Sequence, residues 1–181
     1  MNKLDRIIER LQKRNPIPLL CPNGIWDLEL TKEIEDLSEQ QLETNEKTPF
    51  VLPQAATSGL LLWNDDLVKS HNISQDLSNE IGSFWHGLMH RREGDFSNAK
   101  YWYSKVGDHP VYDSLYEKAW QLSEVVRPWE KWDPYQFIDA VEHVVANGLE
   151  ETGEGEQLRQ IQILEMNLFL QYSLSTKTFV R

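Results

Sequence analysis

Residues 84–112 read FWHGLMHRREGDFSNAKYWYSKVGDHPVY, and this stretch carries the clearest folding signals of the chain. Two helical patterns meet at Gly94, and glycine commonly ends a helix because it adopts the left-handed conformation without strain. Asp95 or Ser97 follows directly, and side chains of these types cap the first turn of a new helix. We therefore expect a helical hairpin over residues 78–106.

Helical signals continue on both sides of this hairpin. Apolar residues recur at the spacing of one helix face along most of the chain. No short segment combines alternation of apolar and polar residues with turn signals at both ends, so we expect no β-sheet. The sequence predicts an all-α fold, a helical bundle of about seven or eight helices. The expected helices cover residues 3–14, roughly 32–43, 53–74, 78–92, 95–106, 111–126, 133–147 and 155–175.

The length of 181 residues suits a single domain with a core of its own. The last helix is apolar on more than one side, which is typical of a helix at the centre of a bundle or of one covered by a second subunit. A homo-oligomer formed through this helix, around Ile161, Leu164 and Leu168, is therefore one expected arrangement. The domain 1–181 divides into a peripheral N-terminal part at 1–52, a helical core at 53–147 and the C-terminal helix at 155–175.

Composition limits the classes of partner. The formal net charge of −11 repels the phosphate backbone of nucleic acids, so we expect no nucleic-acid partner. The sequence has no run of about 18 apolar residues, and its charged N-terminus lacks the apolar centre of a signal peptide, so we expect no membrane span and no secretion. Cys21 is the only cysteine, which excludes an internal disulfide and a cysteine-based zinc site. A cytoplasmic protein that binds a protein or a small-molecule ligand fits these observations.

The hairpin has an internal spacing of small and aromatic residues. Gly87 precedes Gly94 by seven positions, and Phe96, Ala99 and Tyr103 follow at positions two, five and nine after it. This spacing resembles the tetratricopeptide repeat, in which small residues let two helices approach and aromatic residues fill the groove between them. The match covers about 30 residues and no second copy follows at a period of about 34, so the resemblance implies one tetratricopeptide-like hairpin inside a different bundle.

A wider stretch, roughly residues 60–112, combines a WND…SH segment with the pattern HRRE-D-NAKYW-VG-HP. In these residues the chain resembles a family of uncharacterised bacterial and fungal all-helical proteins. The resemblance implies a recurrent helical unit and no known activity.

Three histidines form a candidate metal site. His86 and His90 are four positions apart, so their rings project from one face of a helix and can grip one ion. Glu93 lies on the same stripe, and His71 in the preceding helix can meet both rings across a hairpin. Three neutral imidazoles with an open fourth position suit zinc, or iron when a carboxylate joins them. The sequence requires no cofactor, and it allows a divalent metal at this position.

The same residue types also suit other roles. His86 or His90, oriented by Glu93 or Asp95, could act as a general base without a metal. The signatures of serine hydrolases, of P-loop nucleotidases, of dinucleotide-binding folds and of H-E-x-x-H proteases are absent from the sequence. An enzyme of these classes is therefore poorly supported, and whether the protein is an enzyme stays open.

A polar network in the core is the structural alternative. Buried histidines and arginines are usually hydrogen-bonded groups that fix the register of a bundle. We expect Arg91 or Arg92 to pair with one of four acids, Glu93, Asp95, Asp65 or Asp66. Clustered Trp and Tyr side chains beside His and Arg would instead form a pocket that stacks a ring and pairs an anion.

Three hypotheses for function remain open at this point. In the first, the protein binds a partner or a small ligand through a His/Arg/Glu polar pocket. In the second, it is a metal-dependent or histidine general-base enzyme, and in the third it is a structural or assembly subunit. The candidate metal ligands are His71, His86 and His90. The candidate ligand-binding residues are Trp63, Asn64, His71, His86, His90, Arg91, Glu93, Asp95 and Lys100.

Overall fold

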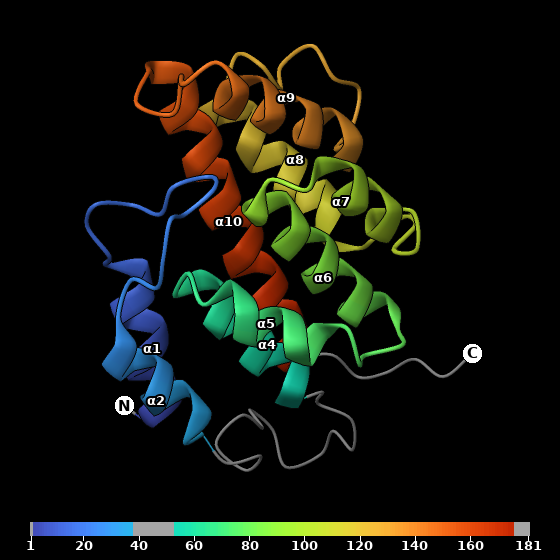
Figure 1. The fold of residues 1–181 in the computed structure, drawn as a ribbon. Helices are drawn as coiled ribbons and strands as arrows, with labels where there is room; N and C mark the ends of the chain where they lie inside the picture. The colour runs from blue at the N-terminus through green and yellow to red at the C-terminus, as the bar shows by residue number, and fades with distance from the viewer. Residues whose placement is uncertain (1, 38–52, 176–181) are drawn as a thin grey trace.

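The computed structural model describes residues 2–37 and 53–175, and over these ranges the chain is all-helical (Figure 1). The all-α prediction is confirmed, although the described residues form nine helices where seven or eight were expected. The helices are α1 (Lys3–Gln12), α2 (Leu28–Glu35), α4 (Pro53–Trp63), α5 (Leu67–Ser74), α6 (Glu80–Glu93), α7 (Phe96–Tyr103), α8 (Val111–Leu122), α9 (Pro134–Ala146) and α10 (Gly153–Ser175).

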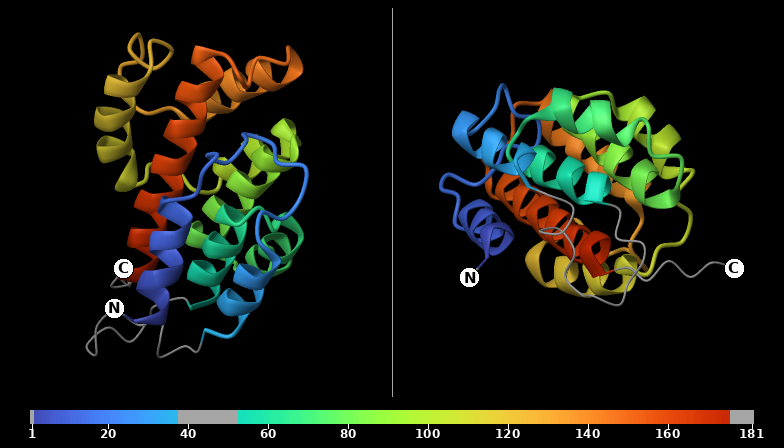
Figure 2. Two further views of the ribbon diagram at one scale, coloured as in Figure 1. Left: turned by 90° about the vertical axis from the view of Figure 1, so that its left-hand side faces the viewer. Right: turned by 90° about the horizontal axis from the view of Figure 1, so that it is seen from below.

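Helix α10 runs through the middle of the bundle. In Figure 2 it lies between a layer formed by α4, α5 and α6 and a second layer that contains α1 and α8. Ile161 is fully buried, and Leu164 and Leu168 pack against the same core. Contacts within the chain therefore account for part of the apolar circumference of α10, and a homo-oligomer through the partly buried Leu164 and Leu168 stays a prediction. None of the described helices is long and apolar enough to cross a membrane.

Capping side chains begin several helices. Asn2 forms a reciprocal capping box with Asp5 at the start of α1. Asn79 caps α6, and Asp133 caps α9 with Pro134 at its first position. Local side-chain chemistry thus fixes the start of each of these three helices.

The hairpin of α6 and α7 has the expected turn. Gly94 ends α6 with a φ of 85°, a conformation that favours glycine, and Asp95 caps α7 by accepting a hydrogen bond from the amide of Asn98. A Cβ atom built on Gly87 would lie 2.9 Å from the Tyr103 ring, so a glycine is needed where the two helices cross. The hairpin itself is confirmed, and its relationship to tetratricopeptide repeats stays a prediction.

One expected helix, residues 53–74, is two helices in the structure. α4 ends at Trp63, and α5 begins at Leu67. Asp65 adopts a φ of 64° between them, and the side chain of Asp66 caps α5 through the amide of Lys69. The prediction of one helix was wrong because Asn and Asp side chains compete with helical hydrogen bonds and favour caps and turns.

Two further boundaries differ from the prediction. α2 begins at Leu28 after the cap Asp27, earlier than the expected start near residue 32, and Thr31 is a buried residue inside the helix. The expected extension of this helix to residue 43 lies partly outside the described residues. α8 ends at Leu122 instead of continuing to residue 126, because Ser123 has an extended backbone.

Candidate metal centre

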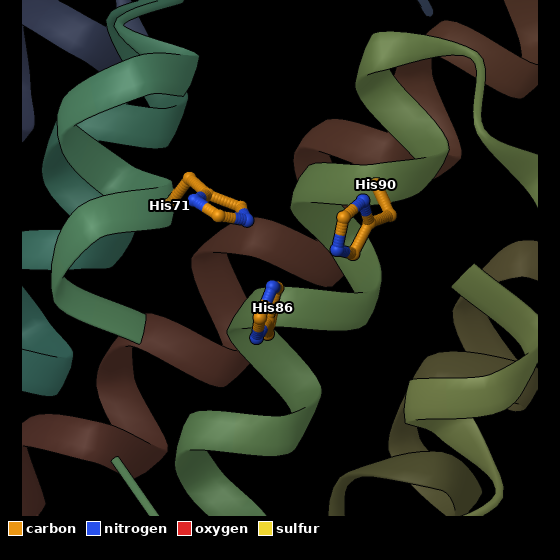
Figure 3. Close-up of side chains that lie close together, drawn as sticks. All are labelled: His71, His86 and His90. Atoms are coloured by element: carbon orange, nitrogen blue, oxygen red, sulfur yellow. The ribbon is translucent and has the colours of Figure 1, made fainter. Parts of the chain in front are cut away.

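Helices α5 and α6 bring three imidazole rings together (Figure 3). His86 and His90 lie one turn apart on α6, and their rings stack with centroids 4.6 Å apart. His71 projects from α5, and its ring meets His86 and His90 edge-on at centroid distances of 4.8 Å and 5.4 Å. The sequence prediction that these three residues meet is therefore confirmed as geometry.

The side chain of His86 is enclosed but poorly satisfied. It is 3 % exposed, and its ring stacks on Trp102 of α7 at 4.1 Å. Both of its ring nitrogens are buried and lack a hydrogen-bond partner within the described part of the chain. Burial, followed by the positive charge that His90 and His71 could carry, lowers the pKa of His86 from 6.5 to about 4. His86 is therefore a neutral imidazole at neutral pH, which is the form that binds metals.

His90 has a carboxylate beside it. Its Nδ1 atom lies 2.6 Å from Oε1 of Glu93, one turn further along α6. A ring N–H that donates to a carboxylate leaves the second nitrogen free to accept a proton or to bind a metal. The side-chain amide of Asn98 on α7 lies 3.2 Å from that second nitrogen, Nε2. Glu93 and Asn98 thus give His90 a fixed ring orientation, and a metal on Nε2 would take the place of the Asn98 amide.

The site has one open side. His71 and Glu93 line an open surface hollow of about 190 Å³, together with Leu67, Val68 and Asn72. His86 and His90 are almost fully buried, whereas the Glu93 side chain is 41 % exposed. An ion that bound the three rings would therefore be enclosed on the α6 and α7 side and reachable from the α5 side.

The spacing of the rings is close to that of a metal site. One nitrogen from each of His71, His86 and His90 lies within 4.8 Å of the others. Two nitrogens on one tetrahedral zinc ion lie roughly 3.4 Å apart, because each bond measures about 2.0–2.1 Å. Rotations of the rings that move their nitrogens by about 1 Å would suffice for coordination. Three imidazoles then leave the fourth position of the ion for water or a ligand.

Asp95 belongs to a second group of possible ligand atoms, with His90 and Glu93. Its carboxylate already accepts from the amide of Asn98 and from the hydroxyl of Ser97 at the start of α7. Capping of the hairpin turn therefore explains Asp95 without a metal.

Arg91 lies apart from the histidines, against α10. Its guanidinium is fully buried and pairs with both carboxylate oxygens of Glu165, at 3.3 Å and 2.5 Å. It also donates to Gln162, while the hydroxyl of Tyr103 donates to Glu165 at 2.9 Å. The expected pocket shared by histidines and Arg91 is corrected, because Arg91 is held in the core by an ion pair.

The expected pairing of Arg92 with Asp65 in the preceding segment is confirmed. It is fully buried, and its guanidinium lies 2.7 Å from Asp65, which also accepts from Arg14 at 2.5 Å. Arg92 further donates to the backbone carbonyl of Leu62 and, at 3.1 Å, to that of Leu19. These bonds hold the loop after α1 and the break between α4 and α5 against α6.

The remaining candidates have structural positions. Trp63 is fully buried in the core, and the amide of Asn64 donates to the carbonyl of Asp27 and to Thr31. Lys100 pairs with Asp139 of α9 at 2.5 Å. The contacts of these three residues are accounted for within the core and by an ion pair, and their role as ligand-binding candidates stays a prediction.

Sequence reasoning missed several important neighbours. Glu165 is one, although an isolated acid in the apolar run ILEMNLFL signals a buried charge with a partner. Trp102 and Asn98 are the others, and only the packing of α7 against α6 brings them to the histidines.

The chain was compared with protein-family models, with curated proteins and with solved structures, and none of the three comparisons found a match.

Proposed function

We propose that the protein binds a divalent transition-metal ion, with zinc as the best-fitting ion, through His71, His86 and His90. The observation that carries the proposal is the environment of His86. A buried polar side chain normally finds a hydrogen-bond partner, since leaving one without a partner costs about 1–3 kcal/mol. The two nitrogens of His86 find none among the described residues, yet two further imidazoles lie beside them. A metal ion would offset this cost.

The ligand chemistry favours zinc. Neutral imidazole suits zinc, copper, iron and nickel, whereas calcium and magnesium require several oxygen ligands. Glu93 would act through His90, because its carboxylate holds the ring nitrogen that faces away from the ion. The lone thiol, Cys21, lies against the backbone of Arg91 and takes no part in the group of ligand atoms.

Cobalt substitution provides the test. Co²⁺ in a site with three histidines and one water gives visible absorption bands whose intensity reports the coordination number. Untagged wild-type protein should show a saturable band at one equivalent of Co²⁺, and an added equivalent of Zn²⁺ should remove it. His71→Gln, His86→Gln and His90→Gln should each abolish the band, with circular dichroism as the check on folding. His143→Gln is the matched control, because this histidine is exposed on α9.

Glu93→Gln sharpens the assignment. The variant keeps the three ligands and weakens the acceptor for His90, so metal affinity should fall by about 10–100-fold while the cobalt spectrum keeps its shape. A band of equal intensity in wild type and in His86→Gln would refute the proposed ligand set.

A second candidate function is hydrolysis by metal-bound water. The specific support is that Glu93 lines the same hollow as His71, so a carboxylate would stand near the open position of the ion. Zinc lowers the pKa of a bound water to about 7, which makes it a nucleophile at neutral pH. Zinc-loaded wild-type protein should then hydrolyse 4-nitrophenyl acetate faster than zinc-loaded Glu93→Gln does. A wild-type rate that does not exceed the rate with free zinc would exclude this candidate.

As part of the same proposal, we place the protein in the cytoplasm, where a lone free thiol is usual.

A further inference from the structure

Trp102 on α7 packs against the proposed metal ligands without being one of them. Its ring stacks on the ring of His86, with centroids 4.1 Å apart and planes inclined by 22°. His86 also stacks on His90, at 4.6 Å and an inclination of 19°. One face of an imidazole has room for only one ring at such distances, so Trp102 and His90 occupy opposite faces of His86. Three rings from two helices thus form one column.

The orientation of the His86 ring depends on this column. Glu93 and Asn98 orient His90. Neither ring nitrogen of His86 has a hydrogen-bond partner among the described residues, although histidine ligands of metals usually receive their restraint from such a bond. Because both faces of His86 are covered, the ring cannot tilt away, and one of its nitrogens stays within 4.8 Å of a nitrogen of His71.

The hairpin of α6 and α7 fixes Trp102 without help from an ion. A Cβ atom built on Gly87 would lie 3.3 Å from the Cβ atom of Trp102, so the two helices approach closely at this point. Gly94 ends α6 at the turn, and Asp95 begins α7 by capping it. The indole is therefore in place before a metal binds, and it holds His86 in the metal-free protein.

Filling of space does not by itself explain an indole at this position. Trp102 is half-buried, and it lines a surface hollow of about 430 Å³ together with Leu77, Ser83 and Lys105. An apolar side chain of similar size would cover His86 equally well. The electron-rich face of an indole has the further property of attracting positive charge, more strongly than the face of Phe or Tyr does. A metal ion withdraws electron density from a bound imidazole, and a stacked indole stabilises the resulting positive charge.

We infer that Trp102 is a positioning residue of the metal site, which holds the His86 ring in the orientation for coordination and stabilises the charge that a bound ion places on it. The inference rests on the proposed metal site and adds to it a residue that does not touch the ion. A leucine in place of Trp102 removes both contributions, whereas a phenylalanine keeps a stacking face with a weaker attraction for positive charge.

Titration with Co²⁺ of the full-length variants Trp102→Leu and Trp102→Phe tests the inference, with dissociation constants measured in competition with a chromophoric chelator. The constant should rise about tenfold or more in Trp102→Leu, which is the effect of losing a residue that orients a metal ligand. It should rise only about two- to threefold in Trp102→Phe. Trp120→Leu is the matched control and should bind as wild type does, since Trp120 is 46 % exposed on α8.

Melting curves of the metal-free proteins, followed by circular dichroism, separate positioning from packing. The loss of affinity should appear in variants whose metal-free melting temperatures stay close to that of wild type. If Trp102→Leu does not fold, Trp102→Met takes its place as an apolar side chain without a ring.

Equal dissociation constants for wild type and Trp102→Leu would overturn the inference and leave the metal site intact. Binding by Trp102→Phe as weak as that by Trp102→Leu would also overturn it, because the aromatic face would then not be the property that matters. Wild-type protein that binds no Co²⁺ would instead refute the metal site itself, and the inference with it.

Discussion

Helix α6 carries two pairs of polar side chains that differ in how completely the chain satisfies them. Arg91 and Arg92 face α10 and the loop after α1, and each is fully buried with carboxylate and carbonyl partners. His86 and His90 face α5 and α7 and are also almost fully buried. His90 has one carboxylate, and His86 has no hydrogen-bond partner among the residues that the structure describes.

The difference separates structural groups from candidate functional groups. A buried charge whose terminal nitrogens pair with carboxylates fixes the register of helices and needs no ligand, although the Nε atoms of Arg91 and Arg92 have no partner among the described residues. A buried imidazole that the described chain leaves unsatisfied is costly, and such costs are found where an ion or ligand binds. The arginines therefore belong to folding, whereas the metal site that we propose gives the histidines a role in function, although only a few positions separate them in sequence.

The largest expected effect comes from removing the carboxylate that pairs with Arg91. Glu165→Gln leaves the Arg91 guanidinium buried without a compensating charge, so the free energy of unfolding should fall by about 3–5 kcal/mol. Urea denaturation followed by circular dichroism measures this loss. In the double variant Arg91→Met with Glu165→Leu, most of the loss should be recovered, because well-packed apolar residues can replace a buried ion pair.

A substitution of His86 is the control for the loss of stability in Glu165→Gln. His86→Gln should lower the free energy of unfolding of metal-free protein by about 1–2 kcal/mol, less than Glu165→Gln does, since ring stacking on Trp102 is lost but no hydrogen bond within the described structure is. A loss as large as that of Glu165→Gln would show that His86 is a structural residue and would remove the contrast.

The next effect is stabilisation by zinc. An ion that binds only the folded protein raises the free energy of unfolding by about 2.7 kcal/mol at a free concentration 100 times its dissociation constant. Differential scanning calorimetry should show this as a higher melting temperature for wild type, and no shift for His86→Gln or His90→Gln. An equal shift in all three proteins would mean that zinc binds elsewhere.

Tyr103 and Tyr112, which line the same pocket, allow the same comparison between a satisfied and an unsatisfied group with a smaller expected change in stability. Tyr103→Phe removes the hydroxyl that donates to Glu165, so unfolding should become easier by about 1–3 kcal/mol. Tyr112→Phe removes a hydroxyl with no partner in the described residues, so stability should stay equal or rise slightly. Thermal melts of the two variants at one pH compare them directly. Equal losses would show that both hydroxyls are satisfied in solution.

His109 is expected to show the smallest effect. Burial lowers the pKa of this histidine from 6.5 to about 4, and its Nδ1 accepts a hydrogen bond from the amide of Val111. In the unfolded chain it takes up a proton below pH 6.5, whereas in the folded protein it stays neutral down to about pH 4. Its contribution to stability is therefore present above pH 6.5 and is lost as the pH falls toward 4. The loss should be about 1 kcal/mol after allowance for solvent screening.

Urea unfolding at about pH 7 and about pH 4.5 measures this loss. Since glutamine does not titrate, His109→Gln should lose less stability between the two pH values than wild type does. Equal losses in the two proteins would assign the acid sensitivity to other groups.

Local signals explain what the sequence predicts correctly. Helix periodicity places His86 and His90 on one face, and the turn at Gly94 and the helix start at Asp133 follow from side-chain chemistry within a few residues. The meeting of His71 with the other two rings was also predicted, because short connections make consecutive helices neighbours in space.

Tertiary packing explains what the sequence could not predict. Arg91 and Glu165 are 74 positions apart, and no local pattern selects this acid over Glu93 or Asp95. The break at Asp65 was missed because apolar residues continue on both sides of it, and the pairing of the Asp65 carboxylate with Arg14 and Arg92 is not visible in the local sequence. The long-range pair with Glu165 also explains why Arg91, a candidate ligand-binding residue, lies in the core.

The most direct test of the account is the metal content of untagged protein, measured by elemental mass spectrometry after purification and after dialysis against zinc. The account predicts about one equivalent of zinc per chain in wild type and in His143→Gln, and almost none in the His86→Gln/His90→Gln double variant. Zinc-free wild-type protein after dialysis, or one equivalent retained by the double variant, would contradict it.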